Sequence, residues 1–309
     1  MPRAPLAAAT LVLGCVGLLA QDAPTVRVSS DLVYFGVTVT DKRGNVIPGL
    51  TTDDFEIIEN GAPQRIMAFA AGTEAASPDL HVGVMFDQSE SMADDIDRAR
   101  TAGIRFLNLV PSAADITLVE FSEHVRVSRF SPDDFPWLVD RIRSSKVDGA
   151  TALYDAFAVY LGHAADDMRQ GRSKNVLVAF TDGGNSFSRT SYADLIATAR
   201  ASQATVYIVG LLDHQSNALR GEIELRMRRI AEETGGLAIF PSSMKQIDSA
   251  YDRIVEEIQG QYSLGYVSSD ARPDGRWRAV RVRVRRPDLK DVRVRTRGGY
   301  YAPHAPAPE

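Results

Sequence analysis

Cysteine is almost absent from this sequence. Cys15 is the only one among 309 residues, and it lies in an apolar N-terminal segment. A single cysteine forms no internal disulfide and does not supply the cysteine-rich ligand set of a usual zinc site. The composition is otherwise globular, with 44% hydrophobic and 24% charged residues. A disulfide-held scaffold is therefore excluded, and the chain is long enough to bury a core without one.

The chain also lacks a strong charge and the common catalytic signatures. Its formal net charge of -5 does not point to nucleic acid or to an anionic membrane. There is no G-x-S-x-G, P-loop, H-E-x-x-H or dinucleotide fingerprint, and the histidines are scattered without metal spacing. A Ser-His-Asp site assembled from distant segments stays open, but no local pattern favours it. We expect a binding protein and not an enzyme.

Residues 1–20 have the pattern of a secretory signal peptide. A short basic start precedes an apolar run that ends at Ala20, and Gln21 to Pro24 are polar or helix-breaking. The run is too short for a comfortable membrane span, which needs about 20 apolar residues. We expect cleavage after Ala20 and an exported protein, periplasmic, on the cell surface or secreted. Lipidation of Cys15 is the less favoured alternative, because Leu13 is bulky for a lipoprotein signal.

The remaining chain divides by pattern into an α/β part between two β-rich flanks. Residues 25–75 form an N-terminal β module, 80–260 alternate strands with helices, 261–301 return to strands, and the Pro- and Ala-rich 302–309 form a disordered tail. The alternation predicts a doubly wound, mostly parallel sheet of Rossmann-like type with helices on both faces. Each flank is too small to fold well alone, so we expect the two to pair into one accessory β-sandwich.

The expected elements follow from hydrophobic periodicity and turn residues. Helices are predicted at 94–109, 132–143, 152–168, 191–202, 219–234 and 243–258. Strands of the α/β part are predicted at 81–86, 115–121, 125–130, 175–181, 204–210 and 237–240. In the flanks, strands are expected at 32–40, 55–59, 65–70, 261–267, 276–285 and 292–296, with a tight hairpin turn at Asn60-Gly61.

Oxygen-bearing side chains gather where the expected strands end. Asp87, Ser89 and Ser91 follow the strand at 81–86, Asp182 follows the strand at 175–181, and Thr151 precedes a helix. Ligand sites of doubly wound sheets form at the carboxyl ends of the strands, so these groups are expected to converge. Carboxylates and hydroxyls suit a hard cation such as Mg²⁺. Two carboxylates balance the ion's charge, and a partner's carboxylate can replace one of the waters that Mg²⁺ retains.

Taken singly, each of these residues is more often an ordinary turn or N-cap residue. Together, the D-x-S-x-S run, the threonine at a helix start and the T-D-G after a strand resemble the metal-ion-dependent adhesion site of von Willebrand factor A domains, over residues 81–260. The resemblance implies Mg²⁺, or Mn²⁺ or Ca²⁺, held by Asp87, Ser89, Ser91, Thr151 and Asp182. It also implies binding of a protein ligand through an acidic residue. The flanks, including Gly49–Phe55 and Arg297–Ala302, resemble a bacterial subfamily of such proteins.

Two other functions compete with metal-dependent adhesion. Arg281, Arg283 and Arg285 alternate with valines, and Arg293, Arg295 and Arg297 follow in the same style. Valines then face the core and arginines the solvent, which is the ordinary outer face of a sheet but also a surface for metal-independent binding of an anionic partner. A metal-assisted hydrolase is the third candidate, with Glu90 as the only imaginable base. The loop at 185–190, with Phe187, borders the expected site and is as readily structural as functional.

Overall fold

The computed structural model describes residues 32–72, 77–110, 113–170 and 173–304, without the side chains of 166–170. The chain separates into two units, residues 1–30 and 31–309, and all described residues belong to the second. The expected signal peptide with Cys15, and residues 305–309 of the expected tail, lie outside the described residues. Among the described helices, none has the length and apolar character needed to cross a membrane.

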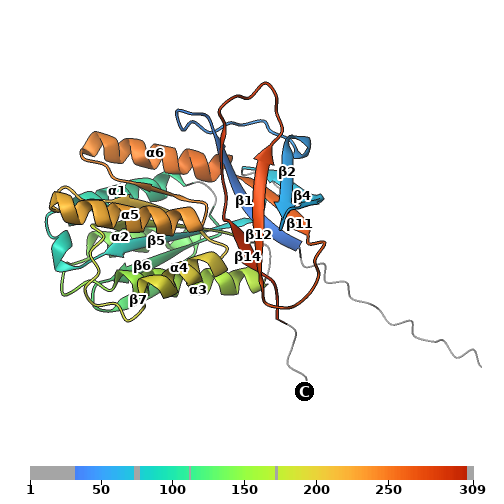
Figure 1. Ribbon diagram of the computed structural model, residues 1–309. Coiled ribbons are helices and arrows are strands. Elements are labelled where there is room, and N and C mark those ends of the chain that lie inside the picture. The colour runs from blue at the N-terminus through green and yellow to red at the C-terminus, as the bar shows by residue number, and fades with distance from the viewer. Residues whose placement is uncertain (1–31, 73–76, 111–112, 171–172, 305–309) are drawn as a thin grey trace, which may run out of the picture. The chain divides into compact units, whose positions relative to one another are not determined.

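Six strands form a mixed sheet in the order β10-β9-β8-β5-β6-β7 (Figure 1). They are β5 (Asp79–Asp87), β6 (Asp115–Phe121), β7 (Val125–Phe130), β8 (Ser173–Thr181), β9 (Thr205–Gly210) and β10 (Leu237–Ile239). All neighbours are parallel except β6 and β7. From β5 the chain moves outward to β6 and β7, then returns to β8 on the other side of β5. The carboxyl ends of β5 and β8 therefore meet at a topological switch point, where ligand crevices form.

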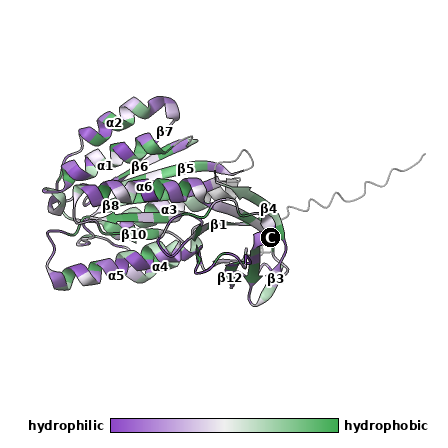
Figure 2. Ribbon diagram, turned by 90° about the horizontal axis from the view of Figure 1, so that it is seen from above, coloured by the Kyte–Doolittle hydropathy of each residue, from purple (hydrophilic) through white to green (hydrophobic). Residues whose placement is uncertain are grey.

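Helices cover both faces of this sheet (Figure 1). One face carries α1 (Ile96–Leu109), α2 (Phe135–Arg143) and α6 (Met244–Gly260), and the other carries α3 (Leu153–Gln170), α4 (Tyr192–Ala201) and α5 (Asn217–Glu233). Side chains alternate along β5, so Val84 and Phe86 enter the first core and Met85 the second. Every residue of β9 is buried, and the central strands are largely green between helices banded purple and green in Figure 2. The predicted doubly wound α/β fold is confirmed.

The flanks form two four-stranded antiparallel sheets, in the orders β13-β1-β11-β4 and β14-β12-β2-β3. Both sheets mix strands from the two ends of the chain, since β1 pairs with β11 and β13, and β2 pairs with β12. A shared apolar core includes Phe35, Ile57, Leu264 and Val282. The accessory β-sandwich built from both flanks is thus confirmed. Its strands are β1 (Leu32–Thr40), β2 (Phe55–Glu59), β3 (Ala62–Gln64), β4 (Ile66–Ala71), β11 (Tyr262–Val267), β12 (Trp277–Val284), β13 (Arg293–Arg295) and β14 (Gly299–Tyr301).

The N-terminal hairpin differs from the expectation in its second strand. Asn60 and Gly61 both adopt positive φ, as a tight hairpin turn requires. The strand that returns beside β2 is the short β3, and the segment expected to return, 65–70, crosses over as β4 to pair with β11 in the other sheet. There Ala70 is buried and Ile66, Phe69 and Ala71 pack partly buried against the sandwich core, whereas Met67 stays exposed. Ala302, the first residue of the expected disordered tail, instead joins the β-sandwich, because its N donates to Arg276 O (2.9 Å).

The arginines of the C-terminal strands do not all face solvent. Arg281 and Arg283 are exposed, as their alternation with buried valines predicts. The expectation is wrong for Arg295, which pairs with the fully buried Glu257 of α6, and for Arg297, which is buried. The Arg297 guanidinium lies 4.3 Å from the centre of the Phe35 ring and donates to Tyr34 O (2.7 Å). Burial lowers the pKa of Arg297 to about 10. Tertiary contacts with the α/β part therefore override the strand alternation at these two positions.

We predict that Arg297→Gln lowers the free energy of unfolding by about 2–4 kcal/mol. The substitution leaves buried carbonyl oxygens without a hydrogen-bond donor and removes the cation from the face of the Phe35 ring. Arg293→Gln is the matched control, since Arg293 lies on the same segment but is exposed. Urea unfolding of both variants measures the difference. Equal losses in the two variants would contradict the assigned role of Arg297.

Candidate metal centre

Three of the predicted ligands lie on the turn that follows β5. Asp87 is the last residue of β5 and is fully buried. Its Oδ1 accepts a hydrogen bond from Ser89 Oγ (2.6 Å) and one from Ser89 N (3.0 Å). Ser89 Oγ lies 3.0 Å from Ser91 Oγ, and Ser91 is exposed. The turn thus forms a continuous chain of oxygens from the buried carboxylate to the surface.

The other two predicted ligands arrive from β8 and from the start of α3. Asp182 directly follows β8, and its Oδ1 accepts from Gly184 N (2.9 Å). A Cβ atom placed on Gly184 would lie 3.2 Å from Asp182 Oδ1, 3.6 Å from Thr151 Oγ1 and 3.8 Å from Ser91 Oγ. One small space beside Gly184 is therefore bordered by oxygens from three separate segments. All five predicted residues belong to this cluster, because Ser89 links Ser91 to Asp87.

The two carboxylates of this cluster have no cationic partner among the described residues. Burial first, and then the nearby Asp182 charge, raise the pKa of Asp87 to about 7, against the lowering effect of the hydrogen bonds that Ser89 and Thr181 donate. Thr181 Oγ1 donates to Asp87 Oδ2 (2.6 Å), and Gln215 Nε2 donates to Asp182 Oδ2 (3.3 Å). Neutral donors only partly offset two desolvated negative charges. The electrostatics therefore favour a positive charge between them.

The chemistry of the donor set fits a hard divalent cation. Every group at the centre is a carboxylate or a hydroxyl, which are the ligands that Mg²⁺, Mn²⁺ and Ca²⁺ accept, and no histidine or thiol is in contact with it. Across the described part of the chain, no cluster of three or more His, Cys, Asp or Glu side chains has the geometry to hold a metal. The oxygen cluster described above contains only two such side chains, Asp87 and Asp182. Its other three members are Ser and Thr hydroxyls, so it is not a cluster of this kind.

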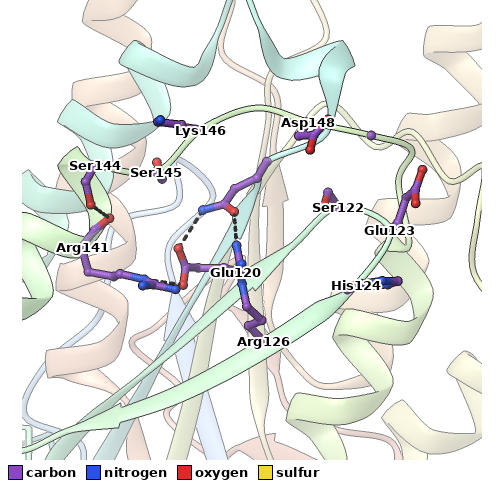
Figure 3. Close-up of a pocket in the computed structure, with 12 residues that line it drawn as sticks. Glu120, Ser122, Glu123, His124, Arg126, Arg141, Ser144, Ser145, Lys146 and Asp148 are labelled. Atoms are coloured by element: carbon purple, nitrogen blue, oxygen red, sulfur yellow. Dashed lines mark hydrogen bonds and ion pairs between the residues drawn. The ribbon is translucent and has the colours of Figure 1, made fainter.

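A polar network holds the turn that follows β5, and Figure 3 shows its members Glu120, Arg126 and Arg141. Gln88 donates through Nε2 to Glu120 Oε1 (2.8 Å) and accepts at Oε1 from Arg126 (3.1 Å). Arg141 of α2 holds the other Glu120 oxygen (2.8 Å). The backbone is held as well, since Gln88 N donates to Phe121 O (2.8 Å) and Asp148 N donates to Gln88 O (2.7 Å). These contacts preorganise the turn before any ligand binds.

Sequence reasoning missed the residues that support the centre. The sequence marks Thr181 only as part of the T-D-G run, whereas in the structure its hydroxyl donates a hydrogen bond to Asp87. Gln215 and Glu120 lie 33 and 32 residues from their partners Asp182 and Gln88, and only the sheet brings them together. The residues after Gly184 serve a structural purpose, since Ser186 Oγ accepts from Thr151 N (3.1 Å), while Phe187 is left exposed.

Comparisons with known proteins agree with this architecture. The sequence profile of the von Willebrand factor type A domain matches residues 81–253. A search of curated protein sequences found no match. Among solved structures, a von Willebrand factor type A protein from Catenulispora acidiphila is similar, with 12% identity, a TM-score of 0.50, and coverage of 90% of this chain and 76% of that one.

Two further structures share parts of the fold. The pilus adhesin SpaC from Lactobacillus rhamnosus GG gives 11% identity and a TM-score of 0.47, over 83% of this chain and 49% of that chain, so this chain spans about half the length of SpaC. An aerotolerance-related membrane protein from Bacteroides fragilis gives 21% identity and a TM-score of 0.45, over 58% of this chain and 98% of that chain. Identities this low show the fold alone.

The profile match spans more than half of the chain and covers the sheet, its helices and the oxygen cluster at its carboxyl edge. The chain therefore belongs to the von Willebrand factor type A domain family.

Proposed function

We propose that this protein binds a divalent cation, Mg²⁺ or else Mn²⁺ or Ca²⁺, and uses it to hold a protein partner through an acidic side chain. Asp87, Ser89, Ser91, Thr151 and Asp182 are the proposed ligands, direct or through water. The observation that carries the proposal is the convergence of oxygens from three segments beside Gly184. Membership of the family supports a protein-binding role.

Charge counting supports binding of an acidic guest. A divalent ion between Asp87 and Asp182 would be neutralised by two carboxylates, and the hydroxyls add no charge. Mg²⁺ prefers six oxygen ligands and exchanges its retained waters for an incoming carboxylate. The bound ion would act as an electrostatic bridge. The residues of this chain hold it, orient it through the clamped turn, and leave its exposed side open near Ser91.

We propose binding and not catalysis. Water activation by a metal needs a general base within hydrogen-bond reach. Among the described contacts, the centre receives hydroxyls, two backbone amides and the Gln215 amide, and both carboxylates serve as proposed ligands. Glu90 is exposed on the short 3-10 turn Glu90–Met92 and makes no side-chain contact with the centre in the described part of the chain.

A second candidate function uses the exposed arginine face of β12. Arg281 and Arg283 are exposed and form no ion pair with the described residues, whereas Arg285 pairs with Glu56. Such a face fits metal-independent binding of an anionic partner. Partner capture that persists in EDTA and is lost at high salt would favour this second function.

We also propose that the protein acts outside the cytoplasm. The support is the basic, apolar and polar order of residues 1–24, which is typical of an export signal. Divalent cations and acidic protein ligands are both available there, so the location is compatible with the proposed bridge.

We predict that Mg²⁺ binds the purified protein saturably and that Asp87→Asn weakens this binding at least about tenfold, because it removes one of two neutralising charges. Isothermal titration calorimetry measures the affinity. Asp53→Asn is the control, since Asp53 is an exposed carboxylate of the β-sandwich. Identical Mg²⁺ titrations of wild type and Asp87→Asn would disprove the metal centre.

Gly184→Ala tests the geometry without removing a ligand. The new methyl group would occupy the space bordered by Asp182, Thr151 and Ser91, so we expect Mg²⁺ affinity to fall about tenfold or more while the fold is retained. Gly184 does not have a left-handed backbone, so the substitution adds no φ strain.

Gly162→Ala is the matched control for this variant. Gly162 lies in α3 with no atom within 4 Å of an added Cβ, so alanine there should leave Mg²⁺ binding unchanged and stabilise the helix slightly. Calorimetry and thermal unfolding of both variants separate loss of binding from loss of fold. Unchanged Mg²⁺ binding in Gly184→Ala would show that the cation lies elsewhere.

A further inference from the structure

A pocket of about 360 Å³ opens directly from the candidate metal centre. Its lining includes three of the proposed ligands, Ser91, Thr151 and Asp182, and the apolar side chains Leu219, Ile223 and Met227 of α5. We call this hollow the α5 pocket. A guest bound at the metal therefore meets an apolar wall on one side.

Two adjacent glycines show how close the polar and apolar parts of the α5 pocket lie. A Cβ on Gly184 would contact the oxygens of the centre, and a Cβ on Gly183 would collide with Ile223 Cγ2 and Met227 Cε. Consecutive Cα atoms are about 3.8 Å apart, so the change from oxygen to hydrocarbon occurs within one residue length of the protein surface. A single short segment of a partner spans both parts.

The charges around the α5 pocket leave only one place for an anion. Arg226 lines the pocket, but its guanidinium is engaged by Glu222 Oε1 (2.6 Å) and donates to Tyr154 Oη (2.9 Å). Glu222 and Asp182 are the other charged side chains of the lining: Glu222 pairs with Arg226, and Asp182 belongs to the centre. A partner's carboxylate is therefore directed to the metal, and its neighbouring group is directed to hydrocarbon.

We infer that the α5 pocket selects the partner, and that the partner is a peptide segment in which an acidic residue lies next to a large aliphatic residue such as Leu, Ile or Met. The carboxylate completes the coordination of the metal, and the aliphatic side chain is buried against α5. Burial of one such side chain is a larger source of discrimination than any exposed polar contact. This inference rests on the proposed metal-dependent binding and adds the chemical identity of the guest.

The test uses the full mature chain and a library of pentapeptides with acetylated and amidated ends. The central residue is Asp or Glu, and the flanking residues vary among Leu, Ile, Met, Ser, Lys and Glu. Binding is measured by fluorescence anisotropy in Mg²⁺ and again in EDTA. We expect Mg²⁺-dependent binding in which an aliphatic neighbour improves affinity at least about tenfold over serine.

Leu219→Thr and Leu225→Thr form a matched pair for this test. Both leucines are exposed on α5, at 46% and 71%, but only Leu219 lines the α5 pocket. Leu219→Thr should reduce the preference for an aliphatic neighbour about threefold or more and leave Mg²⁺ affinity unchanged. Leu225→Thr should change neither quantity, and because both sites are exposed the variants are expected to fold.

The outcomes separate the inference from the proposed function. Mg²⁺-dependent binding without aliphatic preference, or an equal effect of the two leucine variants, overturns the inference and leaves the metal bridge intact. Absence of any Mg²⁺-dependent peptide binding overturns both. Mg²⁺-dependent self-association that is lost in Leu219→Thr, measured by analytical ultracentrifugation, assigns the α5 pocket to a second copy of this chain and overturns the assigned partner.

Discussion

Two buried carboxylates, neither paired with a cationic side chain of the described residues, are the constraint around which this structure is organised. Asp87 ends β5 and Asp182 follows β8, so the topological switch in the sheet places them at the same edge. Hydroxyl and amide donors from Thr181, Ser89 and Gln215 stabilise the two carboxylates in part, but burial, together with the Asp182 charge, keeps the pKa of Asp87 raised. Such an arrangement is unfavourable for folding alone, since a desolvated charge is stabilised only by a close opposite charge. The proposed divalent cation would supply that charge and would couple binding to stability.

Contacts within the rest of the α/β domain fix the position of the sheet edge that carries these carboxylates. Backbone bonds to Phe121 and Asp148 fix both sides of the turn after β5, and the Gln88–Glu120–Arg141 network holds it as well. The turn is therefore formed before a ligand arrives, which lowers the entropy lost on binding. Beside the centre, α5 presents hydrocarbon within one residue length of the oxygens. A metal site alone would contact only a carboxylate, which every acidic partner offers. The apolar wall beside it would add contacts with the neighbouring side chain and so would discriminate between acidic partners.

The β-sandwich is tied to the α/β domain by buried polar contacts. Helix α6 leads directly into β11, and Glu257 of this helix pairs with Arg295 of β13. Arg297 bonds backbone oxygens on both sides, at Tyr34 (2.7 Å) and Ser202 (3.4 Å). Buried charges tolerate little displacement, since moving them leaves donors and acceptors unpaired. Residues 31–309 accordingly form one compact unit.

Local chemistry was sufficient to predict the fold class, the β-sandwich from two flanks and all five members of the oxygen cluster. Helical and strand periodicity determine the α/β alternation, and a sheet of that type places strand ends at one edge whatever the details of packing. Turn chemistry identified the hairpin turn at Asn60-Gly61. It did not identify the partner of β4, because that pairing depends on which surface of the folded sandwich is available to pack against β4. The same limit applies to the arginines: alternation predicts Arg281 and Arg283 at the surface, whereas contacts with residues far away in the chain bury Arg297 and hold the half-buried Arg295 in an ion pair with Glu257. The α5 pocket and the clamp on Gln88 likewise exist only in the tertiary structure, since their members are distant in sequence and share no local pattern.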